Sequence, residues 1–97
     1  MLPVVYLTEV ASDLDAAFME YEQRRAGLGD QFLEALRQRV AAIRMNPALY
    51  GEACPSIRAA PLRRFPFVVY YRIETRHILV IAVRHGHDDP TVWQTRS

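Results

Sequence analysis

The stretch that most constrains the fold is residues 57–73, which read IRAAPLRRFPFVVYYRI. Pro66 has no backbone N–H donor, so it fits the first position of a strand or an edge, and not the interior of a sheet. From Phe67 onward, apolar side chains fall on both alternating faces of the chain. A strand of this kind belongs at the centre of a sheet. We therefore predict a central strand, covered on one face by this chain and on the other by more of this chain or by a partner.

Two helices are predicted before this strand. Ser12 fits the N-cap of the first helix, with Asp15 in the position of a capping-box acid, and Gly27 fits the left-handed residue that ends it. The second helix is predicted to open at Asp30 and to end before Pro47, because proline disfavours helical backbone at the preceding residue. Since the corner between the helices is short, they should lie antiparallel as a hairpin. The residues placed away from the apolar stripe of the first helix are Asp13, Asp15, Glu20 and Glu22.

The remaining pattern predicts a small sheet. Strands are expected at residues 2–7, 57–62, 67–73 and 78–84, and residues 48–55 are expected to be a loop. In the last strand, strict alternation places Ile78, Val80 and Ala82 on one face and Leu79, Ile81 and Val83 on the other. The order β-α-α-β-β-β predicts an α+β fold, with the helical hairpin packed on one face of a small, mostly antiparallel sheet.

No linker or repeat divides the chain, so residues 1–97 are expected to form a single domain. Two helices can cover only one face of the sheet, and apolar residues on the other face predict an interaction surface. No apolar run approaches the about 18 residues that cross a bilayer, which predicts no membrane association. The single cysteine, Cys54, cannot form an internal disulfide. We therefore expect a cytoplasmic protein.

Charge is balanced overall but uneven along the chain. The formal net charge is +1; residues 1–50 carry seven acidic and five basic side chains, and residues 51–97 carry four acidic and seven basic. The second half is therefore expected to face an acidic or phosphate-rich partner. Every cationic side chain is arginine, whose planar guanidinium favours bidentate binding of phosphate or carboxylate.

Several motifs, taken in their order and spacing, resemble a known family over nearly the whole chain. The residues that carry the resemblance are Asp13-Leu14, Tyr21-Glu22, Gly29-Asp30-Gln31-Phe32, Asn46-Pro47 with Tyr50, Ile57-Arg58, Leu62-Arg63-Arg64-Phe65-Pro66-Phe67, Tyr70-Tyr71, Val83 with His85, and Trp93 with Arg96. In this order they are similar to the RelE/ParE superfamily, the toxins of bacterial type II toxin–antitoxin systems. The resemblance implies a plasmid-stabilisation toxin that causes growth arrest. It also implies a cognate antitoxin that lays an extended and helical segment over the toxin.

One fold serves two mechanisms in this superfamily. ParE-like members bind and poison DNA gyrase, whereas RelE-like members enter the ribosomal A site and cleave messenger RNA. RelE-like nucleases usually have a tyrosine close to the C-terminus, but the last tyrosine here is Tyr71 and lysine is absent. Relatives often read His-x-x-Arg-x-Pro after the last strand, where this chain has Asp88 in place of the arginine. We therefore expect a ParE-like inhibitor of DNA gyrase that acts by binding and needs no cofactor. The residues expected to contact the target are Arg63, Arg64, His85, Trp93 and Arg96.

The alternative is a RelE-like, metal-independent endoribonuclease that acts on messenger RNA at the ribosome. Such cleavage needs a base, a cation and an acid around one phosphate. His85 or His87 would transfer the protons, and Arg63 with Arg64 would hold the phosphate. His87, Asp88 and Asp89 share one turn without a distant ligand, so no metal site is expected.

Structural roles stay open for the same residues: His85 as a hydrogen-bonded strand end, Arg63-Arg64 as a solvated turn and Trp93 as a packing anchor. A basic RNA-binding module is a further, non-toxin alternative. However, the chain lacks the paired aromatic stacking motifs of known RNA-binding folds.

Overall fold

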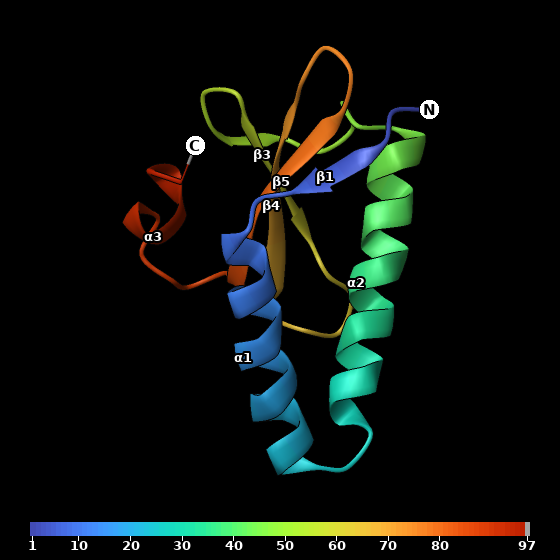
Figure 1. Ribbon diagram of the computed structural model, residues 1–97, viewed down its shortest axis with the longest axis vertical. Coiled ribbons are helices and arrows are strands. Elements are labelled where there is room, and N and C mark those ends of the chain that lie inside the picture. The colour runs from blue at the N-terminus through green and yellow to red at the C-terminus, as the bar shows by residue number, and fades with distance from the viewer. Residues whose placement is uncertain (97) are drawn as a thin grey trace.

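The computed structural model describes residues 1–96, in which two antiparallel helices pack on one face of a five-stranded sheet (Figure 1). The elements in chain order are β1 (Val4–Tyr6), α1 (Glu9–Arg24), α2 (Leu28–Met45), β2 (Glu52–Cys54), β3 (Ile57–Pro61), β4 (Phe67–Ile73), β5 (Ile78–His85) and α3 (Thr91–Gln94). Within the described residues, no helix combines the length and the apolar character needed to span a membrane.

The sheet has the strand order β1-β5-β4-β3-β2, so β4 is its central strand, as the sequence predicts. β1 runs parallel to β5, and all other neighbours are antiparallel. The predicted α+β fold with a mostly antiparallel sheet is therefore confirmed. The β3–β4 turn is closed by the N–H of Leu62, which donates to the carbonyl of Phe67 at 2.9 Å, and the β4–β5 turn by Glu74 and His77 at 2.8 Å.

Several predicted boundaries were wrong. α1 begins at Glu9 and not after Ser12, because the chain turns into helical geometry directly after β1 and the N–H of Val10 already donates to the carbonyl of Leu7. α2 begins at Leu28 and not at Asp30, immediately after the corner. Gly27 does adopt the predicted left-handed backbone, with φ of 89°. The predicted loop at residues 48–55 contains the short edge strand β2.

The main core lies between the helical hairpin and the sheet. Its centre is an aromatic cluster in which the rings of Tyr21 and Phe32 have centroids 5.5 Å apart, and each lies between 5.0 and 5.9 Å from the rings of Phe65 and Phe67. Phe32 is fully buried, and Tyr71 of β4 is buried beneath the same helices. Since burial of a large apolar side chain contributes about 2–3 kcal/mol, this cluster accounts for much of the attachment of the hairpin.

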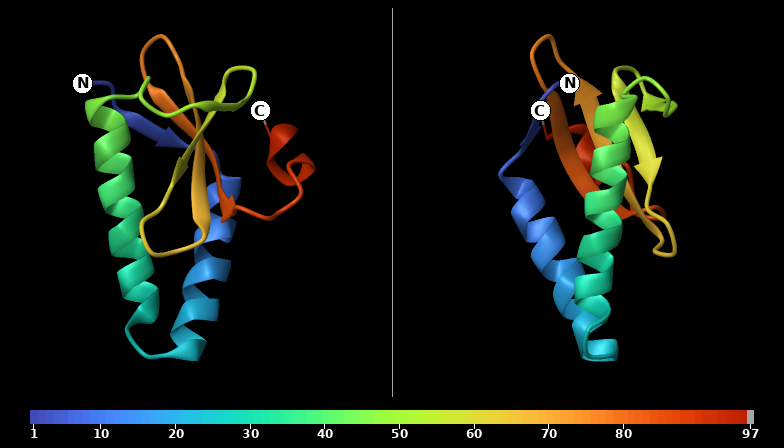
Figure 2. Two further views of the ribbon diagram at one scale, coloured as in Figure 1. Left: turned by 180° about the vertical axis from the view of Figure 1, so that it is seen from behind. Right: turned by 90° about the vertical axis from the view of Figure 1, so that its right-hand side faces the viewer.

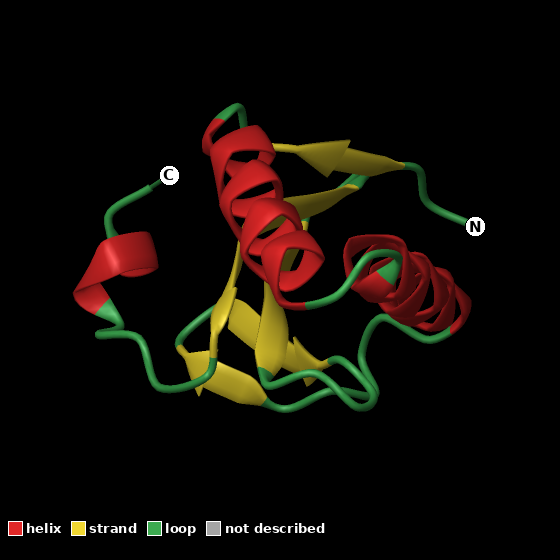
Figure 3. Ribbon diagram, turned by 90° about the horizontal axis from the view of Figure 1, so that it is seen from below, coloured by secondary structure: helices red, strands yellow, loops and turns green. Residues whose placement is uncertain are grey.

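The opposite face of the sheet is partly covered by the C-terminal segment. α3 lies on the side of α1 that is away from α2 (Figures 1 and 3). The ring of Trp93 stacks on that of Tyr70, with centroids 4.0 Å apart and an interplanar angle of 19°. Together with Ile57, Ile81 and Ala82 these residues form a second, smaller core, which gives Trp93 the packing role considered above. The chain itself therefore covers part of the face for which a partner was considered.

The strict alternation predicted for β5 was wrong beyond Ile81. Tyr70 pairs with Ala82, but its neighbour Tyr71 pairs with Val80, so Ile81 is an extra residue in β5. Such a β-bulge shifts the following side chains to the opposite face. Ala82 consequently packs in the second core beside Ile81, and Val83 packs beneath the helices.

The corner between α1 and α2 is fixed by a carboxylate. Glu22, placed on the polar face by the sequence, accepts hydrogen bonds from the N–H of Gly27 at 3.0 Å and of Gly29 at 2.9 Å. Gly29 is buried here, and an added Cβ would lie 2.7 Å from the ring of Phe18 and 2.9 Å from the Glu22 carboxylate. The corner lies at one end of the molecule, and residue 1 lies toward the other end (Figure 2).

This contact predicts that Gly29→Ala destabilises the protein. We expect the free energy of unfolding to fall by about 2 kcal/mol, because overpacking at a closed site forces its neighbours to shift. Urea unfolding measures the loss. Gly51→Ala is the matched control, since a Cβ there meets no atom within 4 Å; equal stability of the two variants would contradict the proposed close packing.

Candidate functional site

The structure divides the predicted contact residues between two surfaces. Arg63 and Arg64 lie in the β3–β4 turn and face α2 across a hollow of about 330 Å³. His85 lies at the end of β5, where a second hollow of about 290 Å³ opens between β5 and α1. Trp93 and Arg96 belong to the C-terminal segment beyond β5. The five residues therefore do not form one continuous cluster.

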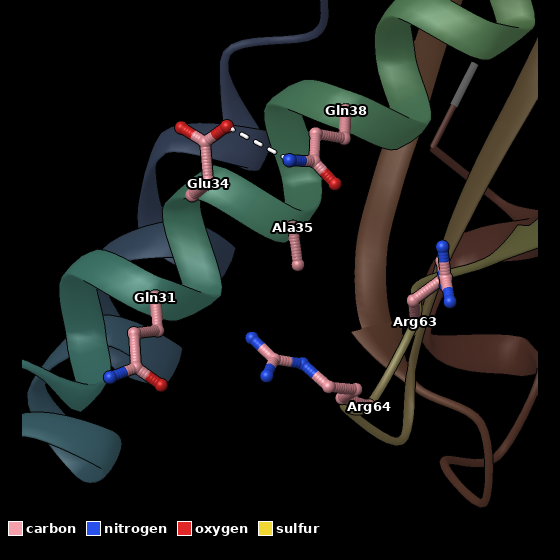
Figure 4. A pocket seen from close by; sticks show the side chains of 6 residues that line it. All are labelled: Gln31, Glu34, Ala35, Gln38, Arg63 and Arg64. Carbon is pink, nitrogen blue, oxygen red and sulfur yellow. Dashed lines mark hydrogen bonds between the residues drawn. The ribbon is translucent and has the colours of Figure 1, made fainter.

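The turn that carries the two arginines is anchored on both sides. Leu62 and Phe65, which flank the pair, are buried, whereas both arginines are exposed. Arg64 has a left-handed backbone with φ of 68°, an uncommon conformation for a residue with a side chain. Its guanidinium extends into the gap toward α2, while that of Arg63 points away from Arg64 (Figure 4).

Neither arginine is neutralised by another side chain in the part of the chain that the structure describes. Among residues 1–96, no hydrogen bond or ion pair joins Arg63 or Arg64 to another side chain. The only carboxylate lining the hollow, that of Glu34, accepts hydrogen bonds from Arg37 and from Gln38, the latter at 3.1 Å (Figure 4). These bonds lower the pKa of Glu34. The hollow consequently presents two uncompensated positive charges, which suits binding of carboxylate or phosphate.

The second surface is built on the buried carboxylate of Asp13, whose side chain is 2% exposed. Arg96 donates to both of its oxygens, from Nη1 to Oδ2 at 2.7 Å and from Nη2 to Oδ1 at 2.9 Å. Arg84 adds a bond to Oδ1 at 3.2 Å, and the backbone N–H of Val83 donates to Oδ2 at 3.1 Å. Asp13 therefore joins α1, β5 and the C-terminal segment.

The position of this carboxylate follows from the unequal lengths of β1 and β5. The last contact of the N-terminal strand region is the N–H of Leu7, which donates to the carbonyl of Val80, but β5 continues to His85. Among residues 1–96, no strand lies beside that edge of β5 beyond Val80. Asp13 accepts the N–H of Val83 there, and Arg96 donates to the carbonyl of Ile81 at 3.2 Å. Asp13 and Arg96 thus form hydrogen bonds with backbone groups of β5 that would otherwise pair with a neighbouring strand.

Burial and pairing act in opposite directions on Asp13. Burial by itself raises the pKa of a carboxyl group, but the hydrogen bonds from Arg96 and from the N–H of Val83, with a further one from Arg84, hold the pKa of Asp13 below its ordinary value. The hydrogen bond to Asp13 correspondingly raises the pKa of Arg96. Asp13 is therefore ionised in the folded protein at neutral pH.

The prediction that Asp13 lies on the polar face of α1 was wrong. The buried residues of α1 are Val10, Asp13, Ala17 and Tyr21, a helical stripe that Asp13 completes. Starting the helix at Ser12 left out Val10, which is the residue that reveals this stripe. The spacing of Val10, Ala17 and Tyr21 was the available signal.

The histidines do not converge with the exposed arginines. Nδ1 of His85 accepts a hydrogen bond from the backbone N–H of His87 at 3.1 Å, and the ring of His85 lies 5.7 Å from that of Phe67. Asp88, which stands where relatives often have an arginine, accepts a hydrogen bond from Nε of Arg84 at 2.9 Å. The residues lining the hollow beside His85 include Asp13, Glu20 and Asp88. Within residues 1–96, no three metal-ligating side chains are grouped as a metal site requires.

Replacement of Asp13 by asparagine preserves the shape of the side chain but removes the charge that faces Arg96. We expect the free energy of unfolding to fall by about 3 kcal/mol, because the partner charges lose their compensation. Urea unfolding followed by the fluorescence of Trp93, the only tryptophan, measures this loss. The pKa of Asp13 is lower in the folded protein than in the unfolded chain. The stability that ionised Asp13 contributes is therefore fully present above the unfolded pKa of about 3.9, and it is lost as the pH falls through the pKa of the folded protein.

The stability of the natural sequence should consequently fall more steeply below about pH 4 than that of Asp13→Asn. Asp15→Asn is the control, because Asp15 is exposed on the same helix. Its replacement should change the free energy of unfolding by less than about 0.5 kcal/mol. Parallel pH curves for the natural sequence and Asp13→Asn would contradict the assigned role of the ion pair.

Comparison with known proteins identifies the family. A family model described as "ParE toxin of type II toxin-antitoxin system, parDE" matches residues 4–90, which includes both hollows but ends before α3. A solved structure described as "Chromosomal ParDE TA system from P. aeruginosa" has the same fold, with a TM-score of 0.66 at 21% identity over 88% of this chain and 96% of that chain. No curated protein matches the sequence. From the family match over most of its length, the chain belongs to the ParE toxins of type II toxin–antitoxin systems.

Proposed function

We propose that this ParE toxin inhibits DNA gyrase by binding to it, in the cytoplasm, and that a cognate antitoxin neutralises it. The observation that carries the proposal is the separation of the groups that RNA cleavage would need. His85 and the uncompensated arginines line different hollows. The cation adjacent to His85, Arg84, is bound to the carboxylates of Asp13 and Asp88.

This separation disfavours the nuclease alternative on electrostatic grounds. A cleaved phosphate requires a free cation to stabilise the charge that develops in the transition state. In the hollow beside His85, the carboxylates of Asp13 and Asp88 bind Arg84, so the cation that lines this hollow is not free to hold that phosphate. Binding to a protein target makes no such demand, because contact residues need only be exposed and suitably placed.

The proposed contact residues are Arg63, Arg64, His85, Trp93 and Arg96, and they differ in accessibility. Arg63 and Arg64 are exposed and can contact a target directly. Trp93 is 2% exposed, and the guanidinium of Arg96 is held by Asp13. Their contribution in this conformation is to fix the C-terminal segment, which exposes Val92 beside Trp93.

Controlled expression of the chain should distinguish gyrase inhibition from messenger cleavage. We expect loss of DNA supercoiling, double-strand breaks and an SOS response while messenger RNAs remain intact. Purified toxin should also inhibit supercoiling of a relaxed plasmid by gyrase. Rapid loss of translation with cleaved messenger RNA, in the absence of any effect on supercoiling, would contradict the proposal.

Replacement of both candidate acid/base residues gives an independent test. In His85→Gln with His87→Gln, glutamine keeps a polar side chain but cannot transfer a proton at neutral pH. We expect growth inhibition within about tenfold of the natural sequence, the cost of one contact of about 1 kcal/mol. Loss of general acid–base catalysis would instead reduce activity about 10²- to 10⁴-fold, which would favour the nuclease. Circular dichroism checks that the variant is folded.

A further inference from the structure

The strand β1 forms an exposed edge of the sheet. It is the first strand in the order β1-β5-β4-β3-β2, so only one of its two sides pairs with a strand among residues 1–96. β1 lies in front of the other strands in Figure 1 and at the rim of the molecule in the right-hand view of Figure 2. Its hydrophobic side chains Val5 and Tyr6 are 45% and 44% exposed. An edge with these properties is a template for pairing with a further strand.

The backbone groups of this edge alternate in direction along β1. The carbonyl of Pro3 and the N–H of Leu7 both form hydrogen bonds with β5, so the odd-numbered residues direct their backbone groups toward β5. The N–H and C=O groups of Val4 and Tyr6 therefore point away from the sheet. Pro3, which has no N–H, faces β5, and it does not interrupt the outer side of the strand.

The opposite edge of the sheet, β2, is protected against such pairing. Its register with β3 shifts between Glu52 and Cys54, the charged side chain of Glu52 is exposed, and Pro55 follows the strand directly. Irregular register, charge and proline each hinder the addition of a strand. β1 has regular register with β5 and no charged residue within Val4–Tyr6. It is therefore the edge at which this sheet can be extended.

The outer side of β1 is complementary to a second copy of itself. In an antiparallel pair centred on Val5, Val4 of each copy lies opposite Tyr6 of the other copy. Because Val4 and Tyr6 carry the outward backbone groups, each of these two pairs can exchange both of its N–H···O=C hydrogen bonds. A shift by one residue would place outward groups opposite residues whose groups face β5. The register centred on Val5 therefore uses every outward group of the strand.

The charges that flank β1 are complementary in the same register. Glu9 begins α1 directly after the strand, and Arg44 lies at the other end, where its Nε donates to the carbonyl of Leu2 at 3.2 Å. Antiparallel pairing brings Leu2 of one copy opposite Thr8 of the other, so Glu9 of each copy comes beside Arg44 of the other. Among the ion pairs formed within residues 1–96, none includes Glu9 or Arg44. Two-fold symmetry would form this pair twice.

An apolar hollow lies at the end of β1 to which the pairing brings the other copy. It has a volume of about 330 Å³ and is lined by Tyr6, Leu7, Thr8, Val10, Ala11 and Leu14. The opposite end of β1 carries the exposed side chains of Met1 and Met45, because the N-terminus lies beside the end of α2 (Figure 1). In the antiparallel pair these flexible side chains come toward the hollow of the other copy, where they would bury apolar surface.

We propose that two copies of this toxin associate through β1, antiparallel and centred on Val5, into a two-fold dimer with one continuous sheet. A second copy fits this edge better than an unrelated strand, because the backbone pairs, the contact of Glu9 with Arg44 and the filling of the hollow all follow from one register. The strands are short and the flanking contacts few, so the dimer should be weak, with a Kd on the order of 10–100 µM. The inference does not depend on the identity of the toxin's target.

Analytical ultracentrifugation of the purified full chain measures the association. We expect the average mass to rise from that of one chain toward that of two as the concentration increases from about 1 µM to about 1 mM. A constant mass of one chain over this range would overturn the proposal and would leave the edge available to a strand of another protein.

Charge-reversal variants test which ends of the two strands meet. Glu9→Arg places like charges together at both ends of the dimer, as does Arg44→Glu, and each should raise the Kd at least about tenfold. An equimolar mixture of the two variants should restore the natural Kd, because in the mixed dimer every reversed charge faces an opposite one. Arg25→Glu makes the same change of charge at an exposed position outside this edge, and it should leave the Kd within about twofold.

A purely structural effect of these substitutions within one chain could not be repaired by mixing two defective chains. Unchanged association of the single variants would overturn the proposal, as would weakened association that mixing does not restore. Circular dichroism checks that each variant is folded.

A disulfide tests the register without any change of charge. Val5 lies on the two-fold axis, where opposite Cα atoms of a non-hydrogen-bonded pair are about 4.5 Å apart, a distance that a disulfide spans. Val5→Cys, combined with Cys54→Ser to remove the natural thiol, should form a covalent dimer under mild oxidation. Met19→Cys with Cys54→Ser is the control, because Met19 is exposed on α1 away from β1. Equally slow cross-linking of the two variants would overturn the proposal.

None of these measurements contains gyrase, so they can succeed or fail independently of the proposed target. Failure of the supercoiling assay with a confirmed dimer would remove gyrase as the target and leave the β1 interface standing. Gyrase inhibition by a chain that stays single at every concentration would remove the β1 interface alone.

Discussion

The buried carboxylate of Asp13 is the interaction on which the arrangement of this toxin depends. Its two oxygens receive hydrogen bonds from the C-terminal Arg96, from Arg84 and from the backbone of β5. A carboxylate so deeply buried is tolerated only because each oxygen has a charged or polar donor. The same pair directs the tail across the open edge of β5, which lets Trp93 reach Tyr70 on the far face of the sheet. One ion pair thus connects the two cores.

The sequence predicts the layers of the fold well and its irregularities poorly. The central strand, the helical hairpin and the left-handed Gly27 follow from periodicity and turn chemistry, which are local. The β-bulge at Ile81 does not, because an uninterrupted apolar strand has no local mark that shows where an extra residue is accommodated. The short strand β2 forms only through its pairing with β3, which residues 52–54 do not encode by themselves.

In the candidate site, too, some features could be predicted from the sequence and others could not. Exposure of Arg63 and Arg64 follows from their position between residues that a core would bury, Leu62 and Phe65. The role of Asp88 could not be inferred in this way, because no local pattern shows that its carboxylate is bound by Arg84. Charge counts along a sequence treat each ionised side chain as available, whereas a folded chain pairs some and leaves others uncompensated. Here the pairing neutralises the surface beside His85 and leaves the hollow at Arg63 and Arg64 positive.

The left-handed backbone of Arg64 has a consequence for how the turn is maintained. A non-glycine residue in this region costs about 1–2 kcal/mol, and glycine would occupy it without that penalty. The turn therefore stores conformational energy where the uncompensated guanidinium of Arg64 is directed toward α2. Local stability and charge placement make opposing demands at this position. Arg64 places a positive charge toward α2 and lowers the local stability of the turn. The buried neighbours Leu62 and Phe65 supply the packing that keeps this strained residue in place.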